Sequence, residues 1–187
     1  MKMINESTWI RMCVGVFIAS ASSVFSVASF ADVPVPGANF PAIEILHVAT
    51  STKVPVVKLG TVTMVNLWAT WCEACKVELS EMEKNLLPIT SGQGGSKLDL
   101  KFVSLDKEPA KAQAWFKQNT TATEVMLGNL YSDAGFELAE KLEADSFPMT
   151  VVIGKDGKII HVERGFKAGQ AGSDQVKKIA ALLKSAL

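Results

Sequence analysis

Residues 61–75 read TVTMVNLWATWCEAC, and this stretch decides the fold. Residues 61–69 are β-branched or apolar almost throughout, which is typical of a strand buried on both faces of a sheet. The residues that follow show an apolar repeat at helical spacing. Its members are Cys75, Leu79, Met82 and Leu86. The sequence therefore predicts a core strand that leads directly into a helix, with two cysteines at the junction.

The two cysteines, Cys72 and Cys75, have the spacing that disulfide exchange requires. Exchange needs one thiolate to attack and a second thiol close enough to resolve the mixed disulfide. Two intervening residues in a first helical turn bring both sulfurs within bonding reach. At a helix N-terminus the free N–H groups and the macrodipole stabilise an anion, which lowers a thiol pKa. We therefore expect Cys72 to attack and Cys75, one turn further in, to resolve.

A metal site is the alternative interpretation of the same spacing, because CxxC also opens zinc knuckles. Zinc would need two more ligands. The only other cysteine is Cys13, and the two histidines, His47 and His161, have no ligand spacing. We therefore predict redox chemistry, with no metal and no cofactor.

Length and charge set the broad class. A chain of 187 residues accommodates one domain and an appendage. Its 19 basic and 19 acidic residues balance, with no basic run. A general nucleic-acid or membrane-surface binder usually shows a basic excess, so we predict no nucleic-acid partner.

The N-terminus, residues 1–31, has the features of a secretory signal peptide. Lys2 and Arg11 precede an uncharged run, and small residues at Ser29 and Ala31 fit a cleavage site after Ala31. An uncleaved membrane anchor is the alternative, because the uncharged run is just long enough to span a bilayer. Both predict an exported protein, periplasmic or anchored at the membrane. Cleavage would leave a single cysteine pair, whose short loop contributes little to stability, so chemistry explains it better.

The rest of the chain predicts an α/β domain over residues 61–187 after an extended lead-in, 32–60, with one short strand or hairpin. Further strands are predicted at 98–105, 125–127, 149–153 and 159–162, the last two joined as a hairpin through Gly154–Gly157. Helices are predicted from the cysteines to Pro88, at 110–118, at 134–142 and at 173–186 with Ser173 as N-cap. Strands that alternate with helices indicate a layered α/β fold with a mixed sheet.

Residues 65–79, VNLWATWCEACKVEL, resemble the TlpA/ResA branch of the thioredoxin superfamily. The resemblance implies a thioredoxin-like three-layer fold, a central mixed sheet flanked by helices, and thiol–disulfide oxidoreductase activity. It also implies that Pro148, in the run Ser146-Phe147-Pro148-Met149-Thr150, is the cis-proline that faces the cysteines. A cis peptide there would expose the backbone of Phe147 to pair with an extended substrate segment. An ordinary trans turn proline is the alternative.

Several residues around the pair bear on mechanism. Asn66 stands where cytosolic thioredoxins carry a buried acid, and a neutral amide cannot accept the proton of Cys75. Glu78 matches an acid typical of the TlpA/ResA branch and is our candidate for proton transfer; a solvated surface glutamate is the alternative. Glu73 places a negative charge beside Cys72, which favours a reductant. Trp71 is predicted to contribute to substrate docking, whereas Trp68 suits core filling.

The resulting hypothesis is an exported enzyme that exchanges disulfides with protein substrates. We expect it to act as a reductant rather than as an oxidant, for example in cytochrome c maturation. Relatives of this kind are recharged by a membrane electron-transfer protein, and we expect such a partner here. The alternative is a non-catalytic binding module or a copper carrier. A thiol peroxidase would need a nearby arginine, and Arg164 is distant in sequence.

Overall fold

The computed structural model describes residues 34–90 and 97–187, all within the unit Ala31–Leu187. The signal peptide predicted over 1–31 lies outside the described residues. The elements follow in the order β1 (Glu44–His47), β2 (Thr52–Pro55), β3 (Val62–Trp68), α1 (Glu73–Thr90), β4 (Leu98–Ser104), α2 (Pro109–Asn119), α3 (Thr123–Gly128), β5 (Leu130–Ser132), α4 (Glu137–Lys141), β6 (Met149–Ile153), β7 (Ile159–Arg164) and α5 (Gln170–Ala186).

The central element is β3, whose seven residues are all buried. The strands are arranged as β2-β1-β5-β4-β3-β6-β7. Strand β3 runs parallel to β4 and antiparallel to β6, so the sheet is mixed as predicted. Because the strand is covered on both faces, most residues in it are apolar. The position of β3 fixes where the cysteines emerge.

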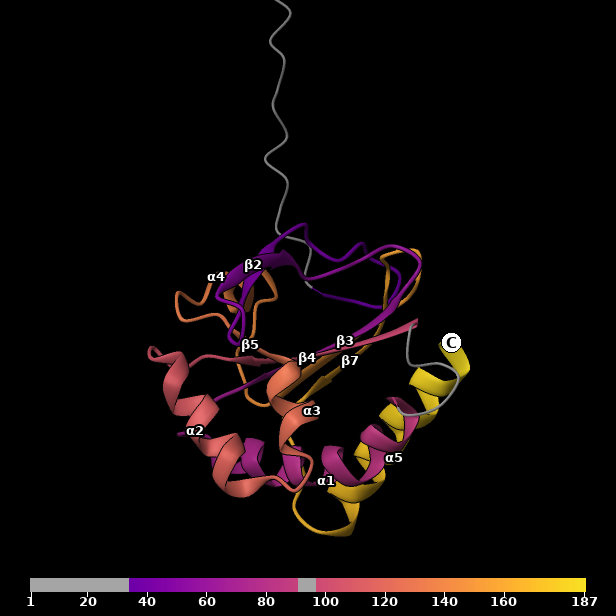
Figure 1. The fold of residues 1–187 in the computed structure, drawn as a ribbon. Helices are drawn as coiled ribbons and strands as arrows, with labels where there is room; N and C mark the ends of the chain where they lie inside the picture. Colours follow the sequence, from indigo (N-terminus) through magenta and orange to yellow (C-terminus); the bar gives the residue numbers. More distant parts are fainter. Residues whose placement is uncertain (1–33, 91–96) are drawn as a thin grey trace, which may run out of the picture. The chain divides into compact units, whose positions relative to one another are not determined.

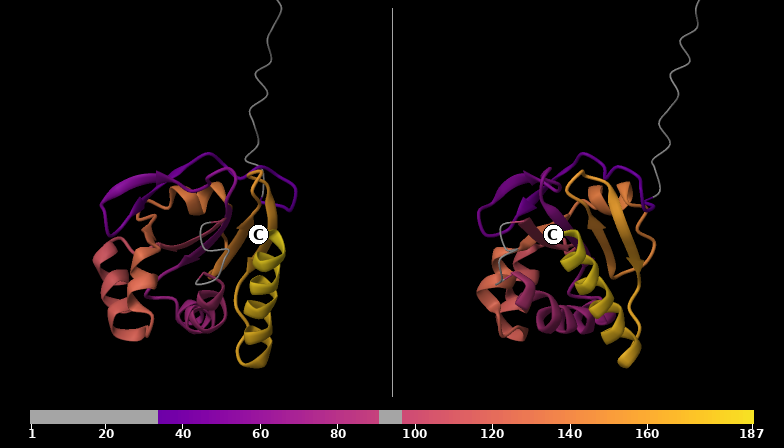
Figure 2. Two further views of the ribbon diagram at one scale, coloured as in Figure 1. Left: turned by 45° about the vertical axis from the view of Figure 1, so that its right-hand side comes forward. Right: turned by 90° about the vertical axis from the view of Figure 1, so that its right-hand side faces the viewer.

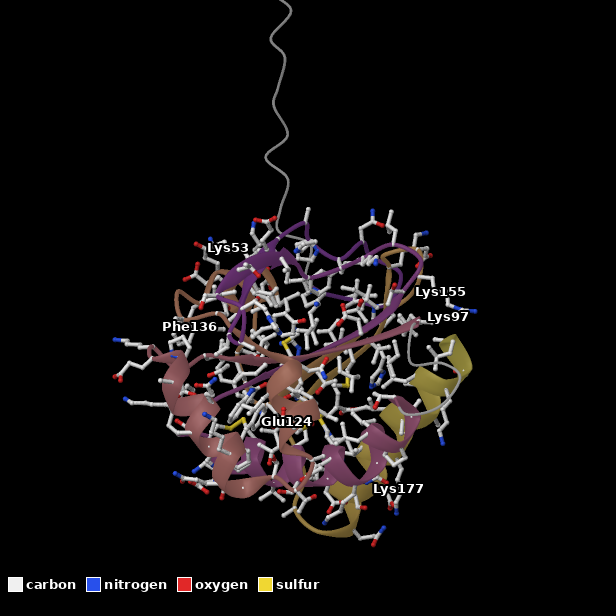
Figure 3. The ribbon with its side chains drawn as sticks, in the orientation of Figure 1. Lys53, Lys97, Glu124, Phe136, Lys155 and Lys177 are labelled. Atoms are coloured by element: carbon white, nitrogen blue, oxygen red, sulfur yellow. A yellow bond between two sulfur atoms is a disulfide. The ribbon has the colours of Figure 1, made fainter. Side chains whose placement is uncertain are left out.

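Helices cover both faces of this sheet, which gives three layers (Figure 1). One apolar cluster packs α1, α2, α3 and α5 against the face that carries Met64 and Trp68. A second cluster packs α4 and the N-terminal segment against the face that carries Val65 and Leu67. Neighbouring residues of β3 therefore belong to different cores, as the alternation of side chains along a strand requires. Charged side chains such as Lys53 and Lys177 point away from the ribbon (Figure 3).

The lead-in, 32–60, contains the hairpin formed by β1 and β2, which pair antiparallel. Strand β1 also pairs antiparallel with β5 and so extends the sheet. At the opposite edge, β6 and β7 form the predicted antiparallel hairpin. Among the described helices, none combines the length and the apolar character needed to cross a bilayer.

Helix α1 continues past Pro88 to Thr90, so the prediction that Pro88 ends it was wrong. Proline lacks the N–H that would bond the carbonyl four residues earlier. In the last turn of a helix this loss concerns a single hydrogen bond, and Leu86, Leu87 and Ile89 are buried around it. Packing therefore outweighs the missing donor.

The strand predicted at 125–127 was also wrong, because these residues lie in α3. The carboxylate of Glu83 accepts the backbone N–H groups of Thr121 and Ala122 at 2.7 and 2.6 Å and fixes the chain just before this helix. The strand is β5 instead, which pairs in parallel with β4. Residues 125–127 favour neither a strand nor a helix strongly, so the sequence alone could not decide between the two.

Two further helix starts differ from the prediction. Helix α5 begins at Gln170, and its N-cap is Gly169 with φ 70°, a left-handed backbone that suits glycine, in place of Ser173. Helix α4 is shorter than 134–142, because Asp133 accepts N–H groups of Leu138 and Ala139 and so fixes the start of the helix. Helix α2 agrees with its prediction within one residue at each end.

Candidate active site

The two cysteines form a disulfide at the N-terminus of α1, with an S–S distance of 2.09 Å. The carbonyl of Cys72 accepts the N–H of Lys76, the first bond of the helix, so Cys72 occupies the N-cap position. Its Sγ accepts the N–H of Cys75 at 3.2 Å, where a capping oxygen usually lies. Cys75 is completely buried, whereas Cys72 is partly exposed. A sulfur held in this position is stabilised as an anion by the helix N-terminus.

The loop that leads into Cys72 is held by Asp106. One oxygen of this carboxylate accepts the N–H of Thr70 at 3.0 Å, and the other accepts its hydroxyl at 2.6 Å. The hydroxyl of Ser104 also donates to Asp106, at 2.8 Å. Asp106 was not singled out from the sequence. The sequence signal that could have revealed this role is an acidic residue directly after a predicted strand. That strand runs parallel to the one that leads to the cysteines, so the two end at the same edge of the sheet.

Glu78 is 1% exposed, so the alternative of a solvated surface glutamate was wrong. It lies three residues after Cys75 on α1 and points to the same face of the helix. Asn66 Nδ2 donates to Glu78 Oε2 at 2.7 Å and to the hydroxyl of Thr150 at 2.9 Å. Burial raises the pKa of Glu78 to about 8, against the lowering effect of the Asn66 hydrogen bond. At neutral pH this carboxyl is therefore mainly protonated.

Asn66 Oδ1 is buried without a hydrogen-bond partner among the described residues. An amide offers both a donor and an acceptor. Its N–H can serve the carboxylate form of Glu78, and after rotation its oxygen can serve the protonated form. With a neutral amide at Asn66, Glu78 is the acidic member of the hydrogen-bonded couple Asn66–Glu78.

The peptide between Phe147 and Pro148 is cis, as predicted. Met149, the next residue, lies opposite Leu67 in the register of β6 and β3, so the proline lies at the end of the sheet from which the Cys72 loop emerges. The rings of Phe147 and Trp71 meet edge to face, with centroids 6.1 Å apart. Trp71 is 58% exposed, which fits a docking role, although that role stays a prediction.

Trp68, by contrast, is fully buried and stacks on Phe116 with ring centroids 4.9 Å apart, as a core residue does. Glu73 is exposed and forms an ion pair with Lys76 at 2.7 Å. The pairing offsets part of the negative charge beside Cys72, and this weakens the argument for a reductant that was based on Glu73 alone.

Comparison with known proteins agrees with this geometry. The family model of the thioredoxin-like domain matches residues 54–179. The chain therefore belongs to the thioredoxin-like family, and its CxxC pair makes it a thiol–disulfide oxidoreductase. No curated protein matches the chain.

Solved structures show the same fold. A thiol-disulfide oxidoreductase from Bacteroides fragilis aligns with a TM-score of 0.58 at 17% identity, covering 76% of this chain and 99% of its own. StoA from Bacillus subtilis aligns with a TM-score of 0.55 at 17% identity, covering 78% and 97%. The exposed lipoprotein thioredoxin Etrx1 from Streptococcus pneumoniae aligns with a TM-score of 0.52 at 20% identity, covering 74% and 99%.

Proposed function

We propose that this protein is an exported reductant of disulfide bonds in protein substrates. The observation that carries the proposal is the asymmetry of the pair: a partly exposed Cys72 sulfur at a helix N-cap is bonded to a fully buried Cys75. The Cys72 sulfur is accessible to a substrate, whereas the buried Cys75 sulfur can react only with Cys72.

In the proposed reaction the reduced protein donates two electrons. The Cys72 thiolate attacks one sulfur of a substrate disulfide, and the other substrate sulfur leaves as a thiolate that takes a proton from solvent. The Cys75 thiol then gives its proton to the Glu78 carboxylate and attacks Cys72 Sγ. The mixed disulfide breaks, the second substrate thiolate leaves, and the protein is left as the disulfide seen in the structure.

Glu78 suits this role because a base works best when its pKa lies near the working pH. Trp71, Phe147 and Pro148 are proposed to bind the substrate, with the backbone of Phe147 pairing to an extended segment. The resemblance of residues 65–79 supports a reductant, for example of the disulfide of apocytochrome c, recharged by a membrane electron-transfer protein. Export is supported by the signal predicted over 1–31 and by the name of Etrx1, an exposed lipoprotein.

Insulin reduction by the purified protein tests the activity. We expect wild type to be active with dithiothreitol as electron donor, and Cys72→Ser to be inactive. Equal rates of insulin reduction for wild type and Cys72→Ser would contradict the hypothesis of an enzyme and favour a binding module. Cys75→Ser should accumulate mixed disulfides through Cys72, and accumulation on Cys72→Ser instead would reverse the two roles.

The redox potential tests the direction of electron flow. A value at about −270 mV or below is that of a thioredoxin-like reductant, whereas one near about −120 mV is that of an oxidant of folding proteins. Equilibration of the Cys72–Cys75 pair with glutathione, followed by thiol alkylation, gives this value.

A further inference from the structure

A row of polar side chains crosses the sheet beneath Glu78. Asn66 on β3 lies opposite Thr150 on β6, and Thr150 lies opposite Glu163 on β7. Directly opposite residues on adjacent strands point to the same face and come within about 5 Å at Cβ. This face is the one that α1 and α5 cover, since Met64 and Val152, two residues away on the same strands, pack there. The row therefore connects the buried Glu78 with the edge of the sheet.

The outer end of the row is charged and reaches solvent. Glu163 is 27% exposed at its side chain and pairs with His161 at 3.2 Å, on the same face of β7. Strand β7 lies alongside α5 in both views of Figure 2. Between them is a surface hollow of about 300 Å³, lined by Glu163 and by groups of α5 and the preceding loop. These groups are Lys167, Ala171, Asp174, Gln175 and Lys178.

We propose that Glu163 is a positioning residue for the redox reaction: its negative charge, presented to Glu78 across Thr150 and Asn66, opposes ionisation of the Glu78 carboxyl and so raises the pH at which Cys75 can be deprotonated. The proposal rests on the proposed function, because it assigns Glu163 a role only through the proton that Glu78 accepts.

Electrostatics gives the direction of the effect. A like charge disfavours ionisation of a nearby carboxyl, and such an interaction is strong where water is excluded. Burial is the main cause of the raised pKa of Glu78, and the charge of Glu163 raises it further. The intervening Thr150 and Asn66 are buried, so little solvent lies between the two groups.

The other charged groups near the row do not replace Glu163. On α1, Glu73 is paired with Lys76, and Glu81 is paired with Lys84. Protonated His161, with Lys167 and Lys178 around the hollow, would reduce the field of Glu163, whereas Asp174 would add to it. The strength of the effect should therefore depend on the charge of His161 as well.

The test compares Glu163→Gln and Glu163→Lys with wild type, using the full chain in its disulfide form. The matched control is Glu44→Gln, which removes an exposed carboxylate from β1 on the far side of the sheet. Titration of the Glu78 side-chain carboxyl by ¹³C NMR, assigned by its loss in Glu78→Gln, reports the pKa without any turnover. Circular dichroism confirms that each variant is folded.

We expect the pKa of Glu78 to fall in Glu163→Gln, to fall further in Glu163→Lys, and to stay unchanged in Glu44→Gln. The pH at which insulin reduction reaches half its maximal rate should move down in the same order. An unchanged Glu78 titration in both Glu163 variants, or an equal shift in the control, would overturn the proposal. Wild type that titrates as expected but fails to reduce insulin would contradict the proposed function instead.

Discussion

Two glutamates on the same helix, Glu78 and Glu83, show how position determines the behaviour of a carboxyl. Glu78 faces the sheet, is 1% exposed and, among the described residues, accepts one side-chain hydrogen bond, from Asn66. Glu83 lies five residues on, is partly exposed, and accepts two backbone N–H groups and the hydroxyl of Thr121 at 2.6–2.8 Å. Burial raises the pKa of Glu78 to about 8. At Glu83 burial also acts upward, but the three donors outweigh it and lower the pKa.

The environment of Glu78 thus suits proton transfer, whereas that of Glu83 suits a structural role. A carboxyl that is buried with few donors stays protonated near neutrality and can change state there. A carboxyl with three donors remains charged and fixes the backbone of Thr121 and Ala122.

Replacing Glu78 by Gln should lower the rate at which the mixed disulfide resolves by about 100-fold, the usual contribution of a general base. In wild type we expect this rate to rise with pH through about 8 as the carboxylate forms, and the variant should lose this rise. Stopped-flow mixing of reduced protein with a peptide disulfide, from pH 6 to 9, measures both. Glu83→Gln is the control, and an equal loss there would remove the contrast.

Glu78 should also make the disulfide form less stable as pH rises. Between its unfolded value of about 4.5 and its folded value of about 8, the folded state holds a proton that the unfolded state has lost. Stability should therefore fall across this window, by at most about 1.4 kcal/mol per pH unit. Urea unfolding at pH 5, 6.5 and 8 should show this slope in wild type and a flatter one in Glu78→Gln. Parallel slopes would show that Glu78 is already ionised at neutral pH.

Glu83→Ala should destabilise the protein at pH 7 by about 1–2 kcal/mol, because it removes the acceptor for three donors at a partly exposed site. The sign of the pH dependence is opposite to that of Glu78. A folded pKa below the unfolded one stabilises above about pH 4.5, and this contribution is lost as pH falls through the folded pKa. Urea unfolding at pH 7 and pH 3 should show a smaller difference between variant and wild type at pH 3.

Lys84→Ala should have the smallest effect, about 0.3–0.5 kcal/mol, as expected of an exposed i,i+3 ion pair. Lys84 is 68% exposed and lies 2.9 Å from Glu81, whose pKa it lowers by this hydrogen bond. Thermal unfolding in low and high salt measures the difference, which should shrink with salt. A loss above 1 kcal/mol would mean that α1 depends on its outer charges more than on its buried face.

Much of this organisation was predictable because it is local in sequence. Residues 61–69 are β-branched or apolar almost throughout, and the first cysteine follows three residues later, so the buried strand and the helix start could be placed by pattern alone. Trp68 and Trp71 were also separated correctly into a core and an exposed residue, since one lies in the strand and the other after it.

The features that the sequence did not predict depend on contacts between segments that are distant along the chain. The burial of Glu78 requires β3 and β6 to lie under α1, and the register that aligns Thr150 with Glu163 is set by the hairpin of β6 and β7. The helix at 123–128 depends on Glu83, about 40 residues earlier. Asp106 acts on Thr70, 36 residues away. No periodicity in a single segment carries such information.

The unequal burial of the two sulfurs also bears on survival under oxidative stress. Peroxide would meet the partly exposed Cys72 first and convert a thiolate there to a sulfenic acid. Cys75 lies within bonding distance and would condense with it, releasing water and closing the ring before the irreversible sulfinic stage. Cys75 would thus protect its neighbour, and chemical damage would end in a disulfide from which a dithiol donor of sufficiently low potential can recover the protein.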